Sequence, residues 1–132
     1  MENKTGSFIF PSGSKYDGEY KEVEGLLIRN GQGVHYCNLT QSTYTGQWEN
    51  DKMNGKGRID FASGAHYEGL WKDNQYQGQG VYGWSDGSTL SGEWNEQCVN
   101  GSSLYQDADK QIWTGDITKG MATILTPNIY QN

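Results

Sequence analysis

Hydrophobic and polar residues alternate along most of this chain, and the alternation is organised around a five-residue cassette of the type aromatic-x-Gly-x-aromatic. Residues 44–48 read Tyr-Thr-Gly-Gln-Trp and residues 67–71 read Tyr-Glu-Gly-Leu-Trp, with related cassettes at 16–20, 90–94 and 113–117. In an extended strand, residues two apart share a face. Each cassette therefore predicts a strand with its rings and glycine on one face and polar side chains on the other.

The cassettes recur at a fixed interval. Gly46, Gly69, Gly92 and Gly115 follow one another every 23 residues. A fixed period in this range is typical of stacked structural units that bury their hydrophobic faces against their neighbours.

Each unit is also expected to contain a returning strand. The segment 50–54 is polar and predicts a turn, whereas Ser85-Asp86-Gly87 predicts the turn that separates two units. One face of the returning strand in the reference unit carries Gly55, Gly57, Ile59 and Phe61. Each unit is therefore predicted to be a β-hairpin.

The repeat divides the chain into units, and its length of 132 residues suits a single all-β domain. The first unit is longer than the others, and its extra residues, at 21–30 and again near 38–41, are expected in a longer hairpin loop. The predicted units are a partial repeat at 5–15, repeats at approximately 16–43, 44–66, 67–89 and 90–112, and a degenerate C-terminal cap at 113–132.

Composition narrows the classes of partner. The net charge is −6, and no stripe of basic residues is present, which disfavours nucleic acid and anionic membranes as partners. The chain shows neither a signal peptide nor an apolar run long enough to span a membrane. Cys37 and Cys98 lie several predicted strands apart, so both are expected to be reduced thiols. We expect a cytoplasmic protein.

Several patterns could indicate chemistry, but each has a simpler structural explanation. Residues 78–83 spell G-x-G-x-x-G, yet no helix follows, so no dinucleotide site is expected. His35 and Cys37 share a strand face, but a structural zinc site needs four ligands and His66 lies in another unit. No base is placed beside a Ser or Cys nucleophile. The sequence predicts no enzyme activity, no cofactor and no metal.

The segment from Tyr44 to Trp71, including the Asn54-Gly55-Lys56-Gly57 run and Gly64, resembles the MORN (membrane occupation and recognition nexus) repeat. The resemblance extends over roughly residues 6 to 117. It implies an elongated, single-layer, twisted antiparallel sheet of consecutive hairpins that serves as a binding surface without chemistry of its own. It also implies an adaptor or scaffold of cytoskeletal, ciliary or sperm structures, or one associated with vesicles.

The aromatic face is the candidate binding site, because a one-layer sheet has no second layer to cover it. Rows of Trp and Tyr are common in interfaces that carry binding energy. The expected partner is a protein segment, either an amphipathic helix or an extended peptide, or a second copy of the chain. The alternatives are recruitment to a membrane or phosphoinositide, and an accessory role that positions a separate enzyme. The candidate contact residues are Tyr44, Trp48, Phe61, Tyr67, Trp71, Tyr82, Trp84, Trp94 and Trp113.

Overall fold

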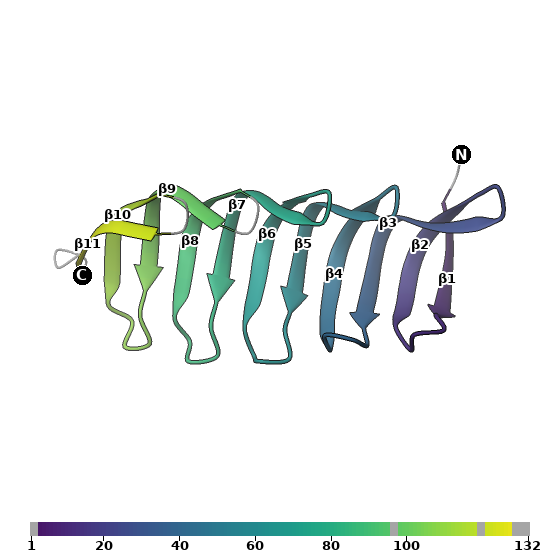
Figure 1. Ribbon diagram of the computed structural model, residues 1–132, viewed down its shortest axis with the longest axis horizontal. Helices are drawn as coiled ribbons and strands as arrows, with labels where there is room; N and C mark the ends of the chain where they lie inside the picture. The colour runs from purple at the N-terminus through teal and green to yellow at the C-terminus, as the bar shows by residue number, and fades with distance from the viewer. Residues whose placement is uncertain (1–2, 96–97, 119–120, 128–132) are drawn as a thin grey trace.

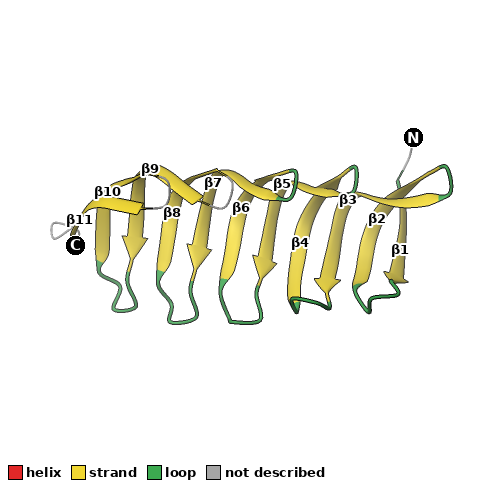
Figure 2. Cartoon of the chain, in the orientation of Figure 1, coloured by secondary structure: helices red, strands yellow, loops and turns green. Residues whose placement is uncertain are grey.

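A computed structural model describes residues 3–95, 98–118 and 121–127, and this part of the chain is one antiparallel sheet without helices (Figure 2). Every strand pairs with the next strand in sequence, so the spatial order is the chain order. The predicted fold of consecutive hairpins is therefore confirmed. The strands are β1 (Lys4–Ile9), β2 (Lys15–Val23), β3 (Leu26–Cys37), β4 (Ser42–Glu49), β5 (Lys52–Asp60), β6 (His66–Lys72), β7 (Gln75–Gly83), β8 (Thr89–Asn95), β9 (Cys98–Gln106), β10 (Ile112–Thr118) and β11 (Met121–Pro127).

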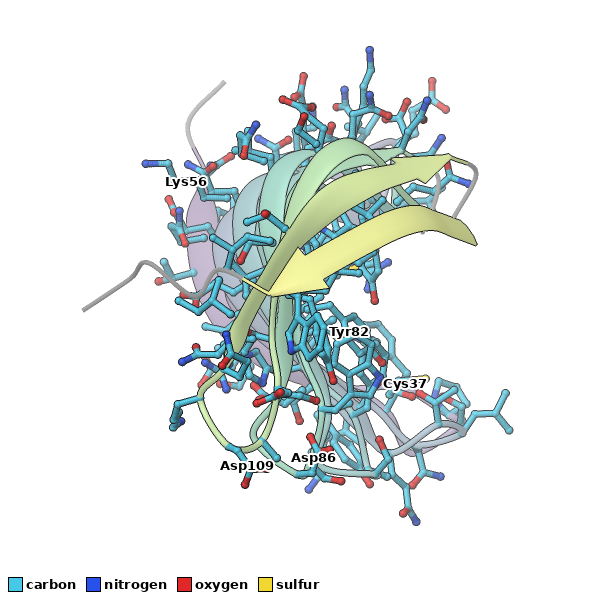
Figure 3. The ribbon with its side chains drawn as sticks, turned by 90° about the vertical axis from the view of Figure 1, so that its left-hand side faces the viewer. Cys37, Lys56, Tyr82, Asp86 and Asp109 are labelled. Carbon is cyan, nitrogen blue, oxygen red and sulfur yellow. The ribbon has the colours of Figure 1, made fainter. Side chains whose placement is uncertain are left out.

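The sheet is long and curved. Its strands lie across the long axis of the molecule, and β1 and β11 lie at opposite ends (Figure 1). Viewed along this axis, the single layer bends into a trough (Figure 3). Tyr82 and Cys37 lie inside the bend, on what we call the concave face, and Lys56 points outward from the convex face. The curvature decides how much of the aromatic face is exposed.

The hairpin turns are tighter than the sequence indicated. The turn between β4 and β5 consists of Asn50 and Asp51, with φ of 49° and 72°, and the next one of Asp73 and Asn74, with φ of 49° and 71°. Positive φ at both central residues is typical of two-residue turns that match the twist of the flanking strands. The strand therefore resumes at Lys52, within the segment 50–54 that was predicted to be turn.

A β-bulge follows each of these turns. Gly46 pairs with Gly57 while Trp48 pairs with Met53, so the returning strand carries extra residues between these two pairs. Gly55 lies in this bulge with φ of 86°, and the Gln47 side chain accepts a hydrogen bond from the Lys56 amide at 2.7 Å. Gly55 lies in the returning strand as predicted and pairs with Trp71 of β6, but alternation alone does not reveal the bulge that it forms opposite β4.

The first hairpin absorbs its extra residues in its strands. After a register shift between Gly18 and Tyr20, β2 and β3 stay paired to Val23 and Leu26, and the turn is Glu24-Gly25. The prediction of a longer loop over 21–30 was therefore wrong, since Lys21 to Glu22 and Leu27 to Asn30 belong to extended strands.

The loops between hairpins follow one pattern. Gly13, Gly64 and Gly87 all have φ near +93°, and the Phe61 amide donates to the Ala65 carbonyl at 2.9 Å as the Phe10 amide does to Ser14. The expected turn role of these glycines is confirmed. Of the predicted cap at 113–132, residues 119–120 and 128–132 lie outside the described residues.

Candidate functional site

The cassette residues make the same hydrogen bonds in successive units. The Tyr44 hydroxyl donates to the Gln47 carbonyl at 2.8 Å, and the Tyr67 hydroxyl donates to the Leu70 carbonyl at 2.9 Å. The indole Nε1 of Trp71 donates to the Gly57 carbonyl at 2.9 Å. The polar atoms of these rings are therefore satisfied within the chain, as buried Tyr and Trp require.

The glycines of the repeat make room for the tyrosine rings. A Cβ on Gly57 would collide with the Tyr44 ring, and a Cβ on Gly80 would collide with the Tyr67 ring. Gly46 and Gly69 face the backbone of the opposite strand just as closely. The conformationally costly glycines inside these strands thus have a packing reason.

Most of the predicted contact residues form the core. Curvature brings neighbouring rings edge to face, for example Tyr44 and Trp71 at 5.1 Å between centroids and Tyr67 and Trp94 at 5.5 Å. A flat sheet would have left them open, but in the trough they cover one another. The predicted residues that retain almost no exposed surface are Tyr44, Trp48, Tyr67, Trp71 and Trp94. Direct contact of these five with a partner stays a prediction, and the bent sheet leaves little surface for it.

The other predicted residues lie lower on the concave face and keep exposed surface. Phe61 and Tyr82 are half-buried, and Trp84 is 40% exposed. The Tyr82 ring lies 6.2 Å from Phe61 and 4.9 Å from Trp84, and Trp84 lies 6.2 Å from Tyr105. We call Phe61, Tyr82, Trp84 and Tyr105 the aromatic strip.

Tyr105, at the end of the strip, and the nearby Trp113 have roles that the sequence did not predict. Tyr105 was not among the predicted contacts, although it follows Tyr82 by one repeat period. The half-buried Trp113 instead donates from Nε1 to the Asp107 carboxylate at 2.9 Å, so part of its bonding capacity is used within the chain.

Acidic residues border one end of the strip. Asp86, Asp107 and Asp109 lie in the last two loops between hairpins, together with one cation, Lys110, and Figure 3 shows Asp86 and Asp109 at the lower rim of the trough. Hydrogen bonds from Ser88 lower the pKa of Asp86, and the bond from Trp113 lowers that of Asp107. Both carboxylates are therefore ionised at neutral pH. The three preceding loops, at 11–13, 38–41 and 62–64, carry no charge.

A small cavity of about 250 Å³ lies at the N-terminal end of the concave face. Its walls include Phe10 and Leu27, and the long first hairpin brings Leu27 and Arg29 over it. Arg29 Nε contacts the Asp51 carboxylate at 2.7 Å, and its guanidinium lies 4.3 Å from the Trp48 ring centroid. Arg29 is thus already paired within the chain.

Burial and the neighbouring charge shift the titration of groups at this cavity. Burial lowers the pKa of His35, and the positive charge of Arg29 lowers it further. Burial opposes ionisation of Asp51, but its hydrogen bonds and charge interaction with Arg29 outweigh this and lower its pKa. Sequence alternation could not reveal this cavity, because it depends on the extended hairpin.

The convex face has a different character. A shallow hollow of about 700 Å³ there includes Lys56, Arg58, Glu68 and Leu70. Arg58 contacts Asp60 at 3.0 Å and Glu68 at 3.7 Å, so charged side chains pair across it. The aromatic strip has no charged residue among its members.

Metal sites, reactive thiols and membrane-spanning helices each require a particular arrangement of residues. Among them no group of three or more His, Cys, Asp or Glu side chains is placed to hold a metal ion. Cys37 is a free thiol whose pKa is lowered by hydrogen bonds from Thr40. In the same part of the chain, no helix is long and apolar enough to span a membrane.

Comparison with known proteins identifies a repeat family. No curated protein sequence matches the chain. The family model described as the MORN repeat matches residues 44–66 and 67–89, which are β4 to β7 with the loops that follow each hairpin. The chain therefore contains two MORN repeats.

Proposed function

We propose that the chain is a non-catalytic adaptor that binds a segment of another protein along the aromatic strip. MORN repeats are commonly modules for interaction with proteins or membranes, and the repeat is generally not catalytic. Of these two partner classes, a protein fits the strip better, since the acidic loops at its border would be repelled by an anionic lipid surface.

The observation that supports this proposal is the exposure of Trp84 next to a core whose rings are buried and hydrogen-bonded within the chain. Trp84 is 40% exposed and contacts Tyr82 and Tyr105 at its sides. Tryptophan and tyrosine side chains contribute strongly to binding when a partner buries them, because they bury a large area with few rotatable bonds. The rigid rows of buried rings above the strip would hold these side chains in place.

The resemblance supports a cellular setting for this adaptor. We propose that the segment from Met53 to Gly115 is related to MORN repeat-containing protein 2, a small member of the family, although no curated protein sequence matches the chain. We accordingly propose a cytoplasmic adaptor of cytoskeletal, ciliary, sperm or vesicle-associated structures. A second copy of the chain and a separate enzyme are further candidates for the partner.

Chemical crosslinking followed by affinity capture from a native extract tests the proposal. Trp84→Ser should reduce capture of the main crosslinked protein by tenfold or more, roughly the effect of losing one binding hot spot. Leu70→Ser, which removes an exposed apolar side chain from the convex face, is the matched control and should leave capture unchanged. Equal loss in both variants, or capture unaffected by Trp84→Ser, would contradict binding at the strip.

A further inference from the structure

The lower row of the concave face changes from apolar to acidic along the molecule. The residues at equivalent positions near the ends of alternate strands are Phe10, Cys37, Phe61, Trp84 and Asp107. The loop that precedes β8 contributes Asp86, and the loop that precedes β10 contributes Asp109 beside Asp107. Lys110 lies in the same loop as Asp107 and Asp109, so the border of the strip is uncharged toward β5 and keeps a net negative charge toward β9.

The spacing of this row matches the spacing of an α-helix. Equivalent positions in consecutive hairpins are two strands apart, about 9.6 Å at the usual distance between strands. Residues seven apart on one face of a helix are separated by about 10.5 Å along its axis. A helix lying along the trough can therefore place one residue near each hairpin, with an offset that grows by about 0.9 Å per hairpin.

We propose that the partner segment is an amphipathic helix whose apolar residues, seven apart, cover Phe61 and Trp84, and whose next turns carry Lys or Arg over the acidic loops beside β8 to β10. This inference rests on the proposed function, because it specifies the partner of the same strip. The charge gradient sets the orientation, since the basic end of the helix lies toward β9 and its uncharged end toward β3.

The long first hairpin supports this placement. Leu27 and Arg29 reach over the concave face at its N-terminal end and share a cavity wall with Phe10. The space above the concave face is thus partly occupied there, whereas the strip lies beyond this hairpin. A helix of a few turns fits between the first hairpin and the acidic loops without meeting Arg29, which is paired with Asp51.

Designed helical peptides of three heptads test the proposal. All the peptides share the same apolar stripe. They differ in the solvent-side residues of one terminal heptad, which are Lys, Gln or Glu. Each peptide is made in two versions, with this variable heptad at the N-terminal or at the C-terminal end. Fluorescence anisotropy at low and high salt gives their affinities. The Lys peptide should bind about tenfold more tightly than the Glu peptide at low salt, and the difference should shrink as salt screens the charges.

Variants of the chain locate the effect. Asp86→Asn with Asp109→Asn should remove most of the preference for Lys, while Asp17→Asn with Glu49→Gln, an equal change of charge on the other face, should preserve it. Trp84→Ser should weaken all the peptides alike. Circular dichroism verifies that each variant keeps the strand signal of the wild type.

The outcomes separate this inference from the proposed function. If Lys and Glu peptides bind equally and both depend on Trp84, the charge-directed orientation is wrong and the strip remains a binding surface. If no peptide binds while the crosslinked native partner still depends on Trp84, the occupant is not a helix of this kind. If capture of the native partner is independent of Trp84, the proposed function fails and the helix with it.

Discussion

At the scale of single residues, the recurring cassette is a set of interlocking contacts. The tyrosine ring occupies the space that a side chain would need at the glycine across the hairpin, as Tyr67 does at Gly80. The next tryptophan donates to the carbonyl of that same glycine, as Trp94 does to Gly80 at 2.9 Å. A change in any of the three residues therefore affects the contacts of the other two.

Replacing Gly80 with alanine tests this interlocking. The added Cβ would collide with the Tyr67 ring, which is fully buried and has no space to move. We expect Gly80→Ala to lower the free energy of unfolding by about 3 kcal/mol, in the range of overpacked cores. Gly25→Ala is the matched control, because its Cβ meets open space and only its φ of 80° is strained; it should cost about 1 kcal/mol. Urea titrations that give equal losses would contradict the packing role of Gly80.

Alkaline pH should weaken the fold through the buried phenols. Burial raises the pKa of Tyr67 from 10.0 to about 12, so the folded state holds the phenol proton more tightly than the unfolded state. The stabilisation is fully present below pH 10 and is lost as the pH rises through 12. Urea unfolding at a series of pH values should show this decline. Tyr67→Phe should make it shallower without abolishing it, because burial also raises the pKa of Tyr16, Tyr44 and Tyr76. A stability that stays constant from pH 10 to 12 would contradict the burial of Tyr67.

At the scale of elements, turns and bulges hold neighbouring hairpins together. The Asn74 side chain accepts a hydrogen bond from the Met53 amide at 2.9 Å, and the Asn74 amide donates to the Met53 carbonyl at 3.1 Å. Asp51 makes the corresponding contacts with Arg29 at 3.1 and 2.8 Å. Each turn thus ties its hairpin to the bulge region of the preceding one, in addition to the strand pairing.

The variant Asn74→Gly isolates the side-chain half of this contact. Glycine tolerates the φ of 71° at this position, so the turn is preserved while the Met53 amide loses its acceptor. We expect a loss of about 1 kcal/mol of unfolding free energy, the usual contribution of one hydrogen bond. Thermal unfolding measured by circular dichroism provides the check, and a melting temperature equal to that of the wild type would show that the contact contributes nothing.

The loop before β10 offers a stabilising change. Lys110 occupies the position of Gly64 and Gly87 and has φ of 71°, in the left-handed region that costs free energy for residues with a side chain. We expect Lys110→Gly to raise the free energy of unfolding by about 1 kcal/mol. Lys110→Ala keeps the strained backbone without the charge, so it should give no such gain. A gain of equal size with alanine would assign the effect to charge instead.

At the scale of the whole molecule, the curved sheet decides which aromatic residues are core and which are surface. The period of 23 residues and the alternation within it were enough to predict the hairpins, the strand faces and the turn glycines. They could not predict the bend, because bending depends on bulges such as that at Gly55, and a bulge leaves no signal in a pattern of alternating residues.

The candidate site was therefore predicted only in part. Phe61, Tyr82 and Trp84, three of the predicted contact residues, keep exposed surface in the aromatic strip, and their contact with a partner stays a prediction, whereas Trp48 and Trp71 are buried by their neighbours. The polar atoms of Tyr44 and Trp48 donate hydrogen bonds to backbone carbonyl groups. No sequence pattern distinguishes such a buried ring from one that is exposed and available to a binding partner. The acidic residues of the loops could not be assigned to the candidate site from the sequence, because their place beside the strip depends on the loops lying along one rim of the trough.

Hydroxyl-radical footprinting of the tryptophans, read by mass spectrometry of the wild-type chain, tests the division between core and strip most directly. The account predicts that Trp84 is oxidised rapidly in the free protein, that Trp48, Trp71 and Trp94 are oxidised slowly, and that the crosslinked partner protects Trp84 alone. Rapid oxidation of Trp48, Trp71 and Trp94 in the folded chain, with protection of these three by the partner, would contradict it and return the binding site to the central aromatic rows.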